Sequence, residues 1–108
     1  MRKRRILILF LVIIVVFPIV TIQLKKLIFA NRVSHYLIEE KGYEKEEIRS
    51  VEGVWGMKMP AYYVIVFFEN EPTIEYTYFA HSGVHQFSYR SIEGKPVTVD
   101  QLKNYEPW

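Results

Sequence analysis

Hydrophobic residues form one uninterrupted block near the N-terminus. Residues 6–24, with the sequence ILILFLVIIVVFPIVTIQL, contain no charged side chain and lie between Arg2-Lys3-Arg4-Arg5 and Lys25-Lys26. At about 1.5 Å of rise per residue, a helix of this length covers the hydrocarbon layer of a bilayer and satisfies its own backbone hydrogen bonds there. We therefore predict a transmembrane helix over 6–24 that acts as a signal anchor, with the lipid bilayer as its partner.

Two other interpretations of this block stay open. A secretory signal peptide also combines a basic start with an apolar segment, and its cleavage would leave a secreted protein. No A-x-A cleavage pattern follows the block, and the nearest alanine, Ala30, has Ile28 two positions before it. A buried helix of a soluble protein would need a larger core than the remaining chain supplies. The pattern favours an uncleaved anchor.

Basic residues flank the block unequally. Four basic side chains and the α-amino group precede residues 6–24, whereas Lys25, Lys26 and Arg32 follow them. Positive charge near the ends of a span tends to stay on the cytoplasmic side. We expect residues 1–5 to be a basic cytoplasmic N-terminus. Residues 25–108 are then expected to form an extracytoplasmic domain on the outer face of the cytoplasmic membrane.

The apolar periodicity beyond the block first predicts a helix. Over 27–41 the spacing of apolar residues gives one hydrophobic face, formed by Leu27, Ala30, Val33 and Leu37. Gly42 then suits the left-handed conformation in which many helices end. No helix breaker separates Leu24 from Leu27, so continuation of the membrane helix into this segment also stays open.

Four β-strands are expected after the acidic segment 43–47. The candidates are 48–57, 62–69 (YYVIVFFE), 73–80 (TIEYTYFA) and 84–91, with turns at 70–72 and 81–83. Residues 62–69 are apolar on both faces, which suits a central strand better than an edge. The pattern predicts an α+β fold in which one helix packs on a four-stranded antiparallel sheet, followed by an irregular or briefly helical tail over 97–108.

Charge is distributed asymmetrically along the chain. The whole chain has a net charge of +2, but residues 27–108 hold eight of the fourteen Lys and Arg residues and all twelve acidic residues, a net of −4. Nucleic acid is therefore not an expected partner, because its phosphates require a basic surface on the folded part. Cysteine is absent, which excludes disulfides, thiol catalysis and thiolate metal sites.

Several segments together resemble a known family. The basic start, the apolar anchor and the segments HYLIEEKGYEKEEIRSVE, YYVIVFFENEP and IEYTYFAHSGVHQFSY resemble small single-pass Gram-positive membrane proteins known only as a domain of unknown function. The resemblance spans most of the chain. It implies a membrane-anchored or exported protein with a small α+β domain, and it brings no known reaction and no established site residues. The helix-then-sheet plan is similar to cystatin-type and PepSY-type modules, an analogy of fold alone.

The polar residues form no recognisable catalytic or metal-binding motif. His81 and His85 lie across a tight turn without a third ligand close in sequence, and His35 lies in the predicted helix. The serines lack a G-x-S-x-G elbow or an S-x-x-K pair, and the clustered glutamates suit a solvated helix end and turn. The five glycines form no phosphate-binding loop. We expect no enzyme activity, no cofactor, no metal site and no bound nucleotide.

One connecting segment, residues 54–63, is unusually rich in large apolar side chains for a loop. Such side chains are enriched in the cores of protein interfaces, and Trp and Tyr also favour the lipid headgroup layer. We predict a contact with a partner protein or with headgroups through Trp55, Met57, Met59 and Tyr62. The simpler interpretation is that these side chains only cover the end of the sheet.

These observations favour an uncharacterised, membrane-anchored, non-catalytic interaction or regulatory module. Its partner would be an envelope protein or a peptide. Two alternatives are an exported enzyme with an unrecognised carboxylate-based site and an immunity-type protein, which is compatible with the size of the chain but has no supporting residue.

Overall fold

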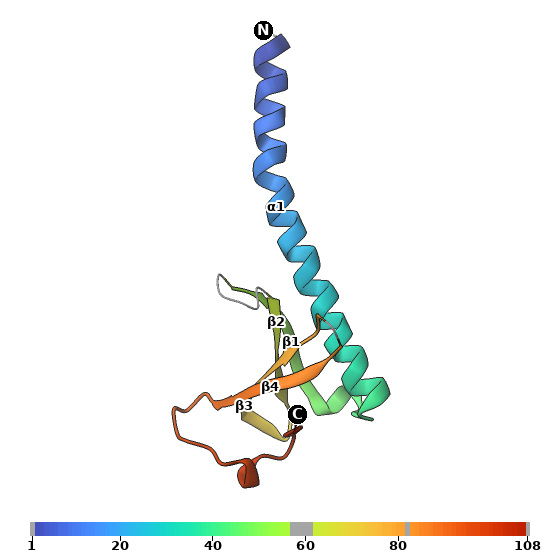
Figure 1. Cartoon of the computed structure of the whole chain (residues 1–108), viewed down its shortest axis with the longest axis vertical. Coiled ribbons are helices and arrows are strands. Elements are labelled where there is room, and N and C mark those ends of the chain that lie inside the picture. Colours follow the sequence, from blue (N-terminus) through green and yellow to red (C-terminus); the bar gives the residue numbers. More distant parts are fainter. Residues whose placement is uncertain (1, 57–61, 82, 108) are drawn as a thin grey trace.

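A long helix and a four-stranded sheet make up the structure, which is a computed structural model describing residues 2–56, 62–81 and 83–107 (Figure 1). Helix α1 covers Arg2–His35 and continues directly into a π-helical turn over Tyr36–Glu40. Counted together, Arg2–Glu40 is the one helix of the described residues that is long and apolar enough to cross a membrane. The fold is α+β, as the sequence predicts.

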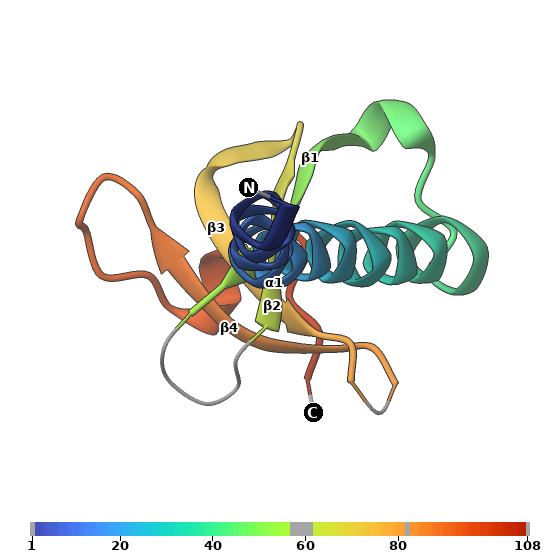
Figure 2. The same cartoon turned by 90° about the horizontal axis from the view of Figure 1, so that it is seen from above.

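The N-terminal half of α1 makes no contact with a protein core. All residues from 2 to 20 are exposed, and the large apolar side chains among them are 46–70% accessible. In both views the axis of α1 changes direction between its blue N-terminal part and its teal C-terminal part (Figures 1 and 2). Pro18 lies within the helix, where it removes a backbone donor and crowds the preceding turn. The Phe17 carbonyl, in the residue before Pro18, accepts a hydrogen bond of 2.8 Å from Thr21 Oγ1.

The prediction of a second, separate helix packed on the sheet is wrong. The predicted helix over 27–41 is the last part of α1 together with the π-helical turn over Tyr36–Glu40, because no glycine or proline lies between Leu24 and Leu27. Ala30, Val33 and Leu37 of this continuation are buried as expected. The apolar pattern also places Leu27 on the buried face, but its side chain is 61% exposed. At this turn of the helix the backbone of Lys26 faces the sheet instead.

The helix ends as the sequence predicts. The Lys41 amide donates to the Tyr36 carbonyl and the Tyr43 amide donates to the Leu37 carbonyl, at 3.1 and 2.9 Å. Gly42 between them has a φ of +77°. This left-handed conformation costs glycine little and lets the chain reverse toward the sheet.

The four strands are β1 (Ile48–Trp55), β2 (Tyr62–Phe68), β3 (Glu71–Phe79) and β4 (His85–Ser91), with short 3₁₀ turns at Lys45–Glu47 and Val99–Gln101. Their order is β1-β2-β3-β4 and every neighbouring pair is antiparallel. The predicted meander with a central 62–69 strand is confirmed. Met57, at the end of the predicted first strand, lies outside the described residues.

The expected turn at residues 70–72 is misplaced. Residues 69 and 70 form the turn, and Glu71 and Pro72 already belong to β3. The strand tolerates Pro72 because the pairing of β2 with β3 is irregular between Val66 and Phe68. Glu71 is held in the strand by hydrogen bonds to its side chain, described below.

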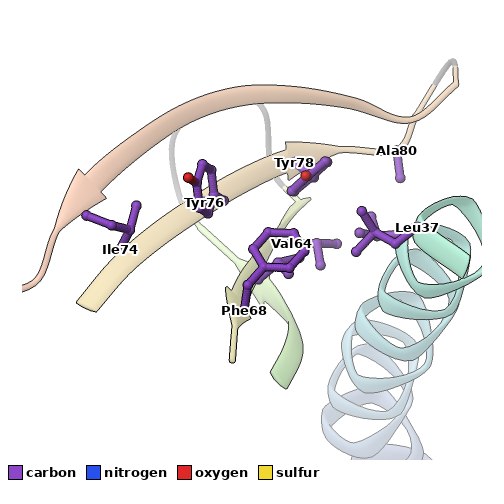
Figure 3. Packing of buried hydrophobic residues seen from close by; sticks show 9 residues of the cluster. Leu37, Val64, Phe68, Ile74, Tyr76, Tyr78 and Ala80 are labelled. Carbon is purple, nitrogen blue, oxygen red and sulfur yellow. The ribbon is translucent and has the colours of Figure 1, made fainter. Parts of the chain in front are cut away.

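The core lies between the C-terminal part of α1 and one face of the sheet. It contains Val33, Leu37, Val64, Val66, Phe68, Ile74, Tyr76, Tyr78 and Ala80 (Figure 3). Seen from above, the teal part of α1 runs across the sheet while its blue part points away (Figure 2). In the predicted third strand, residues 73–80, the alternate side chains of Ile74, Tyr76, Tyr78 and Ala80 therefore point into this core and are buried.

Candidate functional site

The helix and the sheet approach each other most closely at Gly53 of β1. A Cβ atom placed on Gly53 would lie 2.8 Å from the Cα and carbonyl carbon of Lys26 and would collide with its carbonyl oxygen. Glycine is thus required here by space. The contact fixes the height of the sheet along the helix, with Gly53 level with Lys26, two residues after the apolar stretch 6–24 ends.

Aromatic and basic side chains surround this junction. The Phe29 ring lies 5.3 Å from the Tyr62 ring and 4.7 Å from the His81 ring, measured between centroids. Lys25 Nζ lies 5.6 Å from the centre of the Tyr62 ring, and the Arg32 guanidinium carbon lies 5.3 Å from the centre of the Phe29 ring. We call these five residues the junction cluster. Mixed aromatic and cationic surfaces of this kind favour the headgroup layer of a bilayer.

Two of the four predicted contact residues belong to this region. Trp55 and Tyr62 pair across β1 and β2, and Trp55 is 42% exposed. By strand alternation Trp55 lies on the same sheet face as Gly53. The edge of the sheet where β1 ends and β2 begins points toward the N-terminal part of α1 (Figure 1). Met57 and Met59 lie outside the described residues, and a contact of any of the four with a partner stays a prediction.

A buried polar network holds the C-terminal tail, and sequence reasoning did not predict it. Glu71 Oε1 accepts hydrogen bonds from the Tyr76 hydroxyl at 2.6 Å, the Asn104 amide at 3.0 Å and Asn104 Nδ2 at 2.8 Å. The Tyr43 hydroxyl donates to Asn104 Oδ1 at 3.0 Å. Glu71 and Asn104 are both buried. These bonds tie residues 103–106 to the same sheet face that α1 covers.

Gln86 of β4 completes the network. Its Nε2 donates to the Asn104 carbonyl and to the Tyr78 hydroxyl, and its Oε1 accepts from the Glu106 amide, at 2.9–3.1 Å. Burial raises the pKa of Tyr76 and of Tyr78, and the nearby carboxylates of Glu71 and Glu106 raise them further. Both phenols are therefore neutral at physiological pH, with Tyr76 donating to Glu71 and Tyr78 accepting from Gln86. No apolar periodicity in the tail signals this arrangement.

Glu106 joins the tail to the end of the helix. Its Oε1 accepts from the Tyr36 hydroxyl at 3.1 Å and lies 3.2 Å from Lys41 Nζ. The hydrogen bond and charge of Glu106 raise the pKa of Lys41. Glu106 Oε2 is buried without a hydrogen-bond partner among the described residues. The other buried polar side chains of the network, Glu71, Gln86 and Asn104, form hydrogen bonds that attach the C-terminal tail to the sheet.

The sheet face opposite α1 has no covering layer in the described part of the chain (Figure 2). The Phe79 and Phe87 rings stack there with centroids 4.3 Å apart, and Phe87 is 50% exposed. Arg90 and Glu75 form an ion pair of 2.7 Å on the same face. This face offers an aromatic surface to a partner.

His35 and His81 both line the depression between α1 and the β3–β4 connection, and the His81 ring lies tilted by 49° against Phe29 of the junction cluster. His85 meets Phe79 edge to face, with ring centroids 5.8 Å apart. Among the described residues no group of three or more His, Cys, Asp or Glu side chains could hold a metal ion.

Comparison with known proteins gives one match. A family profile described as "Protein of unknown function (DUF3139)" matches residues 1–78. No curated protein and no solved structure matches the chain.

Proposed function

The chain belongs to the DUF3139 family of proteins of unknown function, and from this premise we propose that it is a membrane-anchored, non-catalytic interaction module. Its apolar helix holds the α+β domain at a fixed height on the outer face of the cytoplasmic membrane. One observation carries the proposal: the exposed apolar half of α1 runs without a linker into the half that packs on the sheet.

The continuity of α1 supports an uncleaved anchor over a cleaved signal. Cleavage after the apolar stretch would cut a continuous helix beside the backbone contact of Lys26 with Gly53. The freed segment would keep the packing of Ala30, Val33 and Leu37 but would lose the helical turns that precede it. Short helices of this kind depend on tertiary packing for their stability, so loss of the preceding turns would weaken the domain.

The proposed orientation rests on charge. Arg2, Lys3, Arg4 and Arg5 precede the span, while two of the basic residues beyond it are engaged by the domain. Lys25 lies over Tyr62, and Arg32 lies over Phe29 and donates to the Ala80 carbonyl. These contacts leave both charges in place, so the expectation rests on the excess before the span. Four basic side chains and the α-amino group precede it, against Lys25, Lys26 and Arg32 after it, and this excess favours the N-terminus inside.

Binding is favoured over catalysis because the buried polar groups are engaged with one another. Glu71, Gln86 and Asn104 hold the tail, so they offer no convergent acid and base to a substrate. The aromatic face around Phe79 and Phe87 is the surface that we propose for an envelope protein or a peptide, since aromatic side chains are enriched in interface cores.

Single cysteines test the orientation, because the chain contains none. We expect Lys95→Cys to react with a membrane-impermeant maleimide on intact cells. Lys3→Cys is the matched control and should react only after permeabilisation. The reverse labelling pattern would overturn the orientation, and labelling of neither variant in a washed membrane fraction would overturn the anchor.

Photocrosslinking in living cells tests the binding surface. A photoreactive amino acid at Phe87 should give a crosslinked product of defined mass, whereas the same group at exposed Asp100 should not. Equal products from both positions, or none from either, would contradict the proposed surface.

A further inference from the structure

A groove lies between α1 and the connection from β3 to β4. It is a shallow, open depression of about 620 Å³, lined by Ile28, Asn31, Arg32 and His35 of the helix and by Ala80 and His81 of the connection, among others. The four helix residues are spaced by three and four positions, so they share one face. The groove begins four residues beyond Leu24, the last residue of the apolar stretch.

Arg32 is fixed at the end of the groove nearer the membrane span. Its Nη1 donates to the Ala80 carbonyl at 3.0 Å, and its guanidinium lies over the ring of Phe29, one turn back toward the span. This single bond uses one of the five N–H donors of the guanidinium. A guanidinium held in place presents its remaining donors as a planar fork, the arrangement that suits phosphate.

An apolar strip leads from Arg32 into the span. Ile28 and Leu24 lie four and eight positions before Arg32 and are 48% and 54% exposed. They therefore continue the same helix face. A ligand with an anionic group at Arg32 and a hydrocarbon chain along Ile28 and Leu24 matches both parts of this surface.

The height of Arg32 agrees with such a ligand. Its guanidinium lies at the level of Phe29, five residues beyond Leu24, which corresponds to about 7 Å along the helix axis. The headgroup layer on each side of the hydrocarbon is roughly 5–7 Å thick. The one acidic residue lining the groove, Glu40, lies at its opposite end, about 12 Å farther along the helix.

We propose that this groove binds the phosphate of an anionic phospholipid from the leaflet in which the span ends. Arg32 takes the phosphate, Asn31, His35 and His81 offer further N–H donors beside it, and Ile28 and Leu24 pack along an acyl chain. This inference rests on the membrane anchor of the proposed function. It adds a specific ligand that both positions the domain and is recognised by it.

Native mass spectrometry of the full-length protein released from bilayers tests the proposal. The bilayers contain equal amounts of phosphatidylglycerol and phosphatidylcholine. The wild type should retain one phosphatidylglycerol in preference to phosphatidylcholine by about tenfold, because both lipids carry a phosphodiester but the choline ammonium would stand as a like charge beside Arg32. A ratio of about tenfold is on the order of the energy between two unit charges at contact near a protein surface. Arg32→Gln should lower this ratio to near one. Arg49→Gln, the same change at an exposed position of β1, should leave it unchanged.

Further variants and a soluble anion make the test decisive. Asn31→Glu places a negative charge at an exposed position in the groove and should abolish the preference, whereas Ser50→Glu on β1 should not. Inorganic phosphate should not displace the lipid. Displacement by inorganic phosphate, or equal lipid ratios in the wild type and Arg32→Gln, would overturn the inference. Failure of the protein to float with vesicles would instead overturn the anchor.

Discussion

Replacing Gly53 by Ala is expected to push the helix away from the sheet. The added Cβ would stand 2.8 Å from two Lys26 backbone carbons, whereas carbon atoms pack best at about 3.5–4.0 Å. Since both contacts involve backbone, α1 must withdraw by about 1 Å. A gap of that size forfeits a quarter to a half of the dispersion energy across the interface.

The expected destabilisation is about 2 kcal/mol, within the usual range for overpacking. For a domain of this size it corresponds to a fall of roughly 10 °C in Tm. The loss should be shared by the packing of α1 on β1 and β2, because Ala30 and Val33 are buried in the helix beyond the collision.

The assay is thermal unfolding of the full-length protein in a mild detergent, followed by near-ultraviolet circular dichroism of the packed aromatic residues. Gly56→Ala is the matched control, because its Cβ would meet Tyr63 Cε1 at an ordinary 3.5 Å. It should change Tm by only a few degrees. Equal Tm values for the two variants and the wild type would refute the close approach of α1 to β1.

Three further predictions concern the polar network and the surface. Asn104→Ala removes the Nδ2 donor to Glu71 Oε1 and to Asn70 Oδ1 and the Oδ1 acceptor of the Tyr43 hydroxyl, while the backbone amide of residue 104 still donates to Glu71. It should cost about 1–3 kcal/mol, with faster proteolysis of the tail at Lys103, and an unchanged cleavage rate would count against the network. Because the folded-state pKa values of Tyr76 and Tyr78 are raised above the ordinary 10.0, stability should be full below about pH 10 and fall as the pH rises beyond it. Denaturant titrations at pH 8 to 11 measure this, and Tyr76→Phe should flatten the decline. Arg90→Ala should change the free energy of unfolding by less than about 0.5 kcal/mol in the same titration. The reason is that the Arg90 side chain of the Arg90–Glu75 ion pair is exposed to solvent.

The features that the sequence predicts correctly depend on local patterns. The exposed helix follows from nineteen residues without charge, and the buried side of β3 follows from the alternation of Ile74, Tyr76 and Tyr78. Gly42 ends the helix because only a local conformational preference is involved. Apolarity on both faces likewise places β2 in the interior of the sheet.

The features that it misses depend on distant partners. Glu71 and Pro72 read locally as turn residues, and only the bonds to Asn104, 33 positions later, explain why Glu71 is buried in a strand. Gly53 signals a close approach in general, but nothing near it in sequence identifies Lys26 as the neighbour. The division of α1 into two helices failed because periodicity describes faces and carries no information on continuity.

The depth of Trp55 in a bilayer depends on both the insertion of α1 and the fixed height of the sheet, so its measurement tests the proposed anchoring of the domain. Trp108→Phe leaves Trp55 as the single tryptophan, and lipids brominated at defined depths then quench its fluorescence. Trp55 lies two residues beyond Gly53, about 7 Å along the strand toward the span. The account predicts quenching that is strongest for bromine near the headgroups and weak for bromine near the bilayer centre. Fluorescence that no brominated lipid quenches would contradict it.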